Sequence, residues 1–168
     1  VKMTTSLGSL VIVLDDDQAP ATVANFLSYV DDGSYANTIF HRVIPNFMAQ
    51  GGGFYPGLQM VPTREPVVNE AKSSGLQNNR GTIAMARTNN PDSATRQFYI
   101  NLKDNAFLDP NPNSPGYAVF GRVESGMDVV DLMATKPTSA KSQHQNVPLE
   151  PIVIIGVERM ESVKYMRE

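Results

Sequence analysis

Residues 40–52 read FHRVIPNFMAQGG, which is the pattern of two short β-strands joined by a tight turn. The flanking runs, Thr38–Ile44 and Phe47–Gln50, contain aromatic and β-branched residues, and the Pro-Asn pair between them is typical of turns. In an antiparallel hairpin of this kind Arg42 and Gln50 face each other across the strands, within side-chain reach. The stretch therefore predicts a strand pair that places a guanidinium beside an amide.

Further strands are expected on both sides of this hairpin. They lie at Lys2–Ser6, Ser9–Leu14, Thr82–Arg87, Gln97–Leu102, Tyr117–Val123 and Ile152–Met160. Helices are expected at Pro20–Asp31 and at Met127–Ala134, where apolar residues recur at the spacing of one helical face. Because the strands do not alternate regularly with helices, the pattern favours a mainly antiparallel sheet, either open or closed into a barrel.

Two stretches lack a clear period. Residues 54–80 form a long excursion rich in Gly, Pro and Asn, and such a stretch contains either unrecognised elements or a functional loop. Residues 136–148 resemble a linker in composition, but too few residues follow them to build a second domain. We therefore expect a single domain over residues 1–168.

Composition excludes several classes of protein. Of the 168 residues 41% are apolar and 18% are charged, which indicates a folded domain, and there is no Cys for disulfides, zinc–thiolate sites or thiol catalysis. The longest apolar runs are far shorter than the roughly 20 residues that cross a bilayer. A net charge of -3 gives no broad positive field. We expect no membrane span and no nucleic-acid partner.

Few residues suit acid–base or nucleophilic catalysis. His41 and His144 are the two histidines, and there is no G-x-S-x-G motif. The three aspartates at 15–17 are better explained as a solvated turn before a helix, and the three glycines at 51–53 as a hinge rather than a phosphate loop. Arg42 has two interpretations, as a surface cation with a packed stem or as part of a site with Gln50, and the residues alone leave both open.

The hairpin segment closely resembles the signature segment of the cyclophilins, which are peptidyl-prolyl cis–trans isomerases. The resemblance continues in the family's order and spacing through Gly81–Arg87, Gln97–Asn101, Phe107–Asp109 and Val119–Val123, and so spans nearly the whole chain. The version most like it is the bacterial single-domain cyclophilin. The resemblance implies a mainly β fold, a closed eight-stranded antiparallel β-barrel capped by two α-helices.

The resemblance also implies a set of site residues. Arg42 matches the family's catalytic arginine. The walls of the proline pocket match Phe47, Met48, Tyr99, Phe107 and Leu108. Positions that hold the substrate backbone match Gln50, Ala86, Arg87 and Gln97, and Tyr117 stands in the pocket where many eukaryotic members have His. The resemblance implies no cofactor and no metal.

Three residues depart from the family pattern. Tyr99 stands where Phe is usual, so its hydroxyl needs a partner at the pocket floor. Phe107 stands where cyclosporin-sensitive members carry Trp, and because Phe has no N–H to donate, cyclosporin is expected to bind weakly. Arg96 replaces a residue that is usually small in the family, near the neighbouring substrate subsite, and this leaves the preference beyond proline open.

The expected function is acceleration of rotation about X–Pro bonds in peptides and in unfolded or folding proteins, with Arg42 hydrogen-bonded to the prolyl nitrogen of the twisted amide. The alternatives are a proline-peptide binding module or holdase chaperone, and a hydrolase that depends on His41. We expect His41 to be structural and to face away from Arg42. We also expect a monomer located in the cytoplasm, or in the periplasm if a leader precedes Val1.

Overall fold

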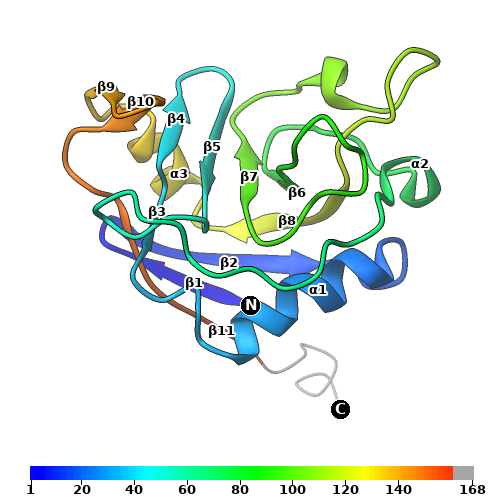
Figure 1. The fold of residues 1–168 in the computed structure, drawn as a ribbon, viewed down its shortest axis with the longest axis horizontal. Helices are drawn as coiled ribbons and strands as arrows, with labels where there is room; N and C mark the ends of the chain where they lie inside the picture. The colour runs from blue at the N-terminus through cyan, green and yellow to red at the C-terminus, as the bar shows by residue number, and fades with distance from the viewer. Residues whose placement is uncertain (161–168) are drawn as a thin grey trace.

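The computed structural model describes residues 1–160, and its main feature is one antiparallel sheet (Figure 1). The strands of this sheet are β1 (Lys2–Thr5), β2 (Gly8–Leu14), β3 (Thr38–Ile39), β4 (Arg42–Ile44), β5 (Met48–Gly51), β6 (Thr82–Met85), β7 (Phe98–Asn101), β8 (Val119–Ser125) and β11 (Val153–Glu158). Their order is β3-β11-β1-β2-β8-β6-β7-β5-β4, and every neighbouring pair is antiparallel. The predicted mainly β, antiparallel fold is confirmed.

The sheet curls strongly without closing into the expected barrel. Its end strands, β3 and β4, are consecutive segments of the chain, separated by Phe40 and His41. The Ile39 N–H donates to the Phe54 carbonyl (2.9 Å) and the Gly52 N–H to the Ile39 carbonyl (3.3 Å), but no ladder joins β3 to β4 in the described part. The eight predicted strands are present, with one split in two, because the residues between β3 and β4 carry the chain from one end of the sheet to the other.

Residues 1–160 contain three α-helices, where the sequence predicts two. α1 (Pro20–Asp31) has the predicted bounds, starts at a proline suited to the first turn, and buries Phe26 and Val30 in the core. α3 (Met127–Met133) matches the second prediction to within one residue. α2 (Ala71–Ser74) is a single turn inside the long excursion, and a 3₁₀ turn, η1, spans Ala106–Leu108. Within residues 1–160 no helix is both long and apolar enough to cross a membrane.

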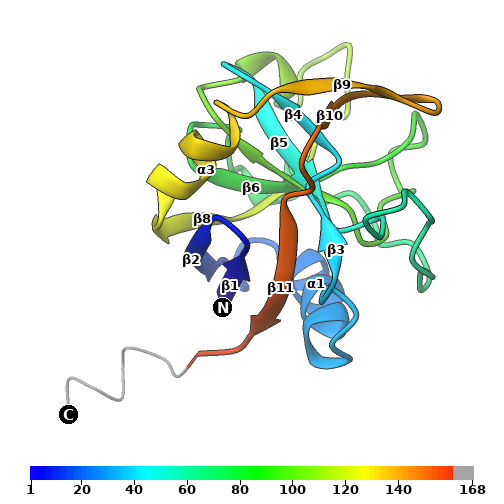
Figure 2. The same cartoon turned by 90° about the vertical axis from the view of Figure 1, so that its left-hand side faces the viewer.

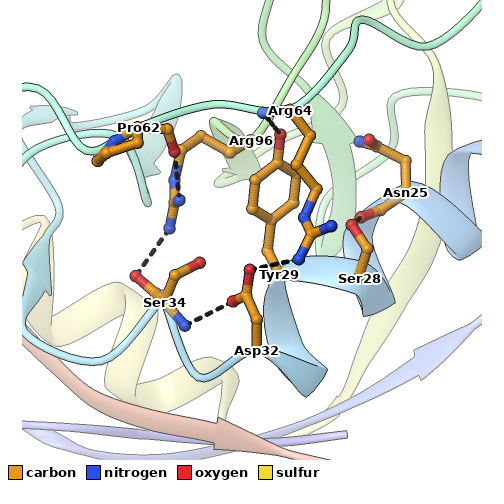
Figure 3. Close-up of polar contacts among 8 residues, drawn as sticks. All are labelled: Asn25, Ser28, Tyr29, Asp32, Ser34, Pro62, Arg64 and Arg96. Carbon is orange, nitrogen blue, oxygen red and sulfur yellow. Dashed lines mark hydrogen bonds and ion pairs between the residues drawn. The ribbon is translucent and has the colours of Figure 1, made fainter.

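Arg96 ties the long stretch 54–80 to the core (Figure 3). Its guanidinium donates three hydrogen bonds to backbone carbonyls: Nε to Gly52 (2.7 Å), Nη1 to Pro62 (3.0 Å) and Nη2 to Ser34 (2.8 Å). These carbonyls belong to segments that carry no regular hydrogen-bond ladder of their own at these positions. Arg96 therefore supplies the hydrogen bonds that secondary structure supplies elsewhere.

The surroundings of Arg96 show that it is a core residue. Its side chain is 1% exposed, and the rings of Tyr29 and Tyr35 lie 4.7 and 5.0 Å from its guanidinium carbon. The Tyr35 hydroxyl in turn donates to the Arg96 carbonyl (2.6 Å). The departure from the family pattern at Arg96 thus lies in the core, because its charged end is directed into the protein and donates its three hydrogen bonds there.

Residues 136–148 form a hairpin rather than a linker. β9 (Thr138–Lys141) and β10 (His144–Pro148) pair with each other in a separate two-stranded sheet, with an irregular register between His144 and Val147. Figure 2 shows this hairpin over β4 and β5, and β10 is in contact with β4. The hairpin thus packs against the end of the large sheet that carries Arg42.

Candidate active site

The β4–β5 hairpin has the register that the sequence predicts. Arg42 pairs with Gln50 and Ile44 with Met48. The turn is tight, since the Phe47 N–H donates to the Ile44 carbonyl (3.1 Å), and Asn46 at its apex has a positive φ of 60°, which asparagine tolerates better than most residues. This turn places Phe47 and Met48 at one end of the hairpin and the polar pair at the other.

A cavity of about 160 Å³, which we call the slot, opens beside this hairpin. It is lined by Arg42, Phe47, Met48, Gln50, Ala86, Arg87, Tyr99, Leu108 and Tyr117. Every one of these residues belongs to the predicted site. They come from three strands (β4, β5 and β7), the β4–β5 turn, the 3₁₀ turn η1 and two loops, so the curled sheet brings together residues that are up to 75 positions apart, from Arg42 to Tyr117.

A chain of polar side chains forms one side of the slot. Gln50 Nε2 donates to Gln97 Oε1 (2.9 Å), and Arg42 Nη1 makes a long contact with Gln50 Oε1 (3.5 Å). Gln97 does not line the slot but supports Gln50 from behind, against Gly53, where a Cβ would collide with the Gln97 side chain. Arg42 is exposed, lines the slot and has no carboxylate partner among residues 1–160, so its positive charge at the edge of the slot is uncompensated.

The other walls of the slot are apolar. Met48 and Tyr99 are 2% and 5% exposed and form its floor. Phe107 is 66% exposed and lies outside the lining, where its ring stacks on Phe47 with 5.7 Å between centroids. The predicted wall residues are thus brought together, except that Phe107 supports the rim rather than the interior.

Arg87 uses its side chain within the protein. Nε and Nη2 donate to the Gly116 carbonyl (3.3 and 2.9 Å), Nη1 donates to the Thr88 carbonyl (2.8 Å), and the guanidinium carbon lies 4.3 Å from the centre of the Tyr117 ring. This cation–π contact holds Tyr117 against the slot. The backbone of Arg87 and the aliphatic part of its side chain therefore remain available to a ligand in the slot. Its guanidinium is bound to the Tyr117 ring and to the loop carbonyls.

The Tyr99 hydroxyl has the hydrogen-bond partner that a buried hydroxyl needs. It donates to Asn78 Oδ1 (2.7 Å), and burial raises the pKa of Tyr99 well above its usual range, which keeps the hydroxyl protonated. Asn78 is fully buried and is not among the predicted site residues. No pattern in the sequence distinguishes it from the other asparagines of the long excursion.

His41 is buried away from the slot, as expected of a structural residue. It is 5% exposed, its ring lies 4.6 Å from that of Phe54 and 5.7 Å from that of His144, and it is not part of the slot lining. Burial, followed by the nearby His144 and Arg42, lowers the pKa of His41 to about 4. A neutral, enclosed imidazole here fits packing under the β9–β10 hairpin better than hydrolysis.

The lowered pKa of His41 predicts that the free energy of unfolding decreases in acid. Between the ordinary pKa of 6.5 and the folded value of about 4, the unfolded chain binds a proton that the folded chain does not, so stability is highest above pH 6.5 and falls as the pH drops toward 4. The loss should approach about 3 kcal/mol, at roughly 1.4 kcal/mol per unit. Urea unfolding at pH 7 and pH 5 measures it, and His41→Phe should flatten the difference; an equal slope in both proteins would show that His41 is not responsible.

The comparisons with known proteins agree with this geometry. Residues 1–159 match the family model described as cyclophilin type peptidyl-prolyl cis-trans isomerase. A peptidyl-prolyl cis-trans isomerase of Acinetobacter baylyi is 56% identical, over 94% of this chain and 84% of the relative. A second relative, from Streptomyces antibioticus, is 55% identical over 92% of this chain and 94% of its own length.

Solved structures show the same fold at much lower identity. The crystal structure of a cyclophilin type peptidyl-prolyl cis-trans isomerase of Cryptosporidium parvum, in the presence of the dipeptide Ala-Pro, has a TM-score of 0.78 to this chain, at 24% identity, and covers 96% of this chain and 98% of that one. Together with the match to the family model, the fold and the close relatives lead to one conclusion: this chain belongs to the cyclophilin-type peptidyl-prolyl cis-trans isomerases.

Proposed function

We propose that the slot holds the ring of a prolyl residue and that Arg42 donates a hydrogen bond to the prolyl nitrogen as the X–Pro bond twists. The observation that carries this proposal is the position of an uncompensated guanidinium, backed by Gln50 and Gln97, at the edge of an apolar cavity of about 160 Å³. The protein would act in this way on proline-containing peptides and on unfolded or folding proteins, and so assist folding.

Isomerisation of an X–Pro bond requires little more than a hydrogen-bond donor beside an apolar cavity. Rotation about the peptide bond breaks amide resonance, at a barrier of about 18 to 20 kcal/mol, and makes or cuts no covalent bond. In the planar amide the nitrogen lone pair is delocalised, whereas in the twisted amide it returns to nitrogen, which becomes an acceptor. A donor placed at that nitrogen therefore favours the transition state over both planar ground states.

The apolar walls complement Arg42. Burial of the three ring methylenes against Phe47, Met48 and Leu108 contributes about 0.8 kcal/mol per methylene and anchors the ring while the rest of the amide turns. A bound ring would exclude water from the side of the exposed guanidinium that borders the slot, which would strengthen its hydrogen bond to the substrate. The presence of Ala-Pro in the Cryptosporidium structure supports a proline-containing ligand.

Phe107 bears on the response to cyclosporin. Its ring packs on Phe47 at the rim and has no N–H group. A ligand that depends on a donor at this position would lose that hydrogen bond. We therefore propose that cyclosporin binds weakly.

A refolding experiment tests the role in folding. For a substrate protein whose slow refolding phase is the isomerisation of one X–Pro bond, normally tens to hundreds of seconds, the rate of that phase should rise in proportion to added enzyme. An excess of an Ala-Pro tetrapeptide should suppress the acceleration by occupying the slot. A holdase would reduce aggregation and leave the rate of the slow phase unchanged, and that result would reject the proposal.

A further inference from the structure

One buried amide connects three walls of the slot. The side chain of Asn78 is completely buried, and its Nδ2 donates to the carbonyls of Leu108 and Tyr117 (both 3.3 Å) and to Asp109 Oδ1 (2.9 Å). Its Oδ1 accepts from the Tyr99 hydroxyl (2.7 Å). Tyr99, Leu108 and Tyr117 all line the slot. Tyr99 lies on β7, whereas Leu108 and Tyr117 lie outside the strands and are joined by one backbone hydrogen bond, from the Tyr117 N–H to the Leu108 carbonyl (2.9 Å).

The main chain of Asn78 adds to the same connection. Its N–H donates to the Asp109 carboxylate (2.6 Å), so Asp109 receives two hydrogen bonds from a single residue. Its carbonyl accepts from the N–H of Asn105 (2.8 Å), at the start of the turn that carries Leu108. Asn78 thus fixes the segment 105–109 from both its side chain and its backbone.

Two neighbouring asparagines extend the network to the fourth wall. Asn101 Nδ2 donates to Asn78 Oδ1 (3.1 Å) and to Thr82 Oγ1 (2.9 Å). Asn105 Nδ2 donates to Asn101 Oδ1 (2.8 Å) and to the carbonyl of Phe47 (2.9 Å). The network therefore reaches the tip of the β4–β5 hairpin, and the walls on both sides of the slot are fixed relative to the same buried group.

The orientation of the Asn78 amide is determined by its partners. On the Nδ2 side it meets a carboxylate and two carbonyls, which can only accept. On the Oδ1 side it meets the protonated Tyr99 hydroxyl and the Asn101 amide group, which donate. A flipped amide would lose contacts on both sides, so the network has one arrangement and resists distortion of the slot.

We propose that Asn78 is a positioning residue of the isomerase, which sets the width of the slot and so its affinity for the prolyl ring. The proposal rests on the proposed function in one respect, that the slot is where proline binds. Among the described residues Asn78 makes no hydrogen bond to Arg42 or Gln50, and the polar side of the slot has its own support in Gln97. Loss of Asn78 should therefore weaken the capture of substrate more than the rotation step.

The test compares Asn78→Ala with the wild type, at a temperature at which circular dichroism shows both folded. NMR titration with an Ala-Pro tetrapeptide gives Kd, and exchange spectroscopy gives KM and kcat. We expect Kd and KM to rise by about tenfold while kcat stays within about threefold. Unchanged Kd and KM, or a fall in kcat at constant Kd, would overturn the proposal.

Two further variants separate positioning from general destabilisation. Asp109→Ala removes a half-buried carboxylate that accepts twice from Asn78, should fold, and should raise Kd by about threefold; it decides the matter if Asn78→Ala does not fold. Thr22→Val removes a buried hydrogen bond to Glu70 from a helix residue that does not line the slot and is not bonded to Asn78, and should leave Kd, KM and kcat unchanged. A Thr22→Val variant that loses affinity as Asn78→Ala does would contradict positioning.

If the proposed function itself were wrong, the experiment would give a different result. In that case the wild type itself shows no slot-directed binding of the peptide, or no exchange. If the wild type binds and isomerises the peptide and the variants match it, only the role of Asn78 is rejected.

Discussion

Replacement of Arg42 by alanine is expected to lower kcat/KM for an X–Pro peptide by at least about a hundredfold, while the Kd of the peptide changes by less than about threefold. A hundredfold corresponds to about 2.7 kcal/mol, the contribution of a hydrogen bond from a charged donor that forms fully only in the twisted amide. Arg42→Lys should lose nearly as much, because a compact ammonium lacks the planar fork that Gln50 orients.

Exchange NMR on the same peptide measures both quantities. Arg122→Ala is the matched control, since Arg122 is also an exposed arginine on a strand of the sheet, β8, but does not line the slot. It should behave as the wild type. If Arg42→Ala reduced affinity and kcat/KM by the same factor, Arg42 would be a binding group for the ground state and the proposed mechanism would be incorrect.

The second large effect is expected on stability, from Arg96→Met. Methionine keeps much of the apolar stem and removes the guanidinium, so the carbonyls of Gly52, Pro62 and Ser34 lose their donors inside the protein. A buried acceptor without a partner costs about 1 to 3 kcal/mol, and the carbonyls nearer the surface can recover some of this from water. We expect the free energy of unfolding to fall by about 3 to 5 kcal/mol.

Urea unfolding of Arg96→Met and of Arg64→Met provides the comparison. Arg64 also lies over the Tyr29 ring, at 5.7 Å, but its side chain is 52% exposed and it pairs with Asp32 at the surface (Figure 3). Its loss should cost less than about 1 kcal/mol. Equal and small losses in the two variants would mean that the buried hydrogen bonds of Arg96 do not hold the loop.

The parts of the fold that the sequence predicts are those with a local, periodic cause. α1 has the predicted bounds because its apolar stripe, its proline and the following glycine all act within one segment. The pairing of Arg42 with Gln50 follows from the length of one tight turn. In both cases the determining residues lie within a few positions of the element that they define.

The parts that the sequence does not predict depend on distant partners. α2 is one turn long, too short for an apolar period, and the register of β9 and β10 is irregular. Arg96 and Asn78 belong to residue types that are usually exposed, and what keeps them inside is a set of carbonyls and hydroxyls from remote segments. Burial of this kind is a property of the assembled structure and leaves no pattern in the chain.

The candidate site divides in the same way. The family resemblance supplies every residue that lines the slot, but not the support behind it: Gln97 acts through Gln50, Phe107 supports the rim through Phe47, and Asn78 is absent from the prediction. The difference arises because the lining is recognisable as sequence blocks, whereas the support is visible only as contacts.

The position of β1 in the sheet has a consequence for folding during synthesis on the ribosome. β1 lies between β2 and β11, so it cannot complete its pairing until Val153–Glu158 has been translated. A nascent chain must therefore leave the exit tunnel with one edge of β1 still open to other polypeptides. The sheet is therefore completed only after the segment that contains β11 has been made.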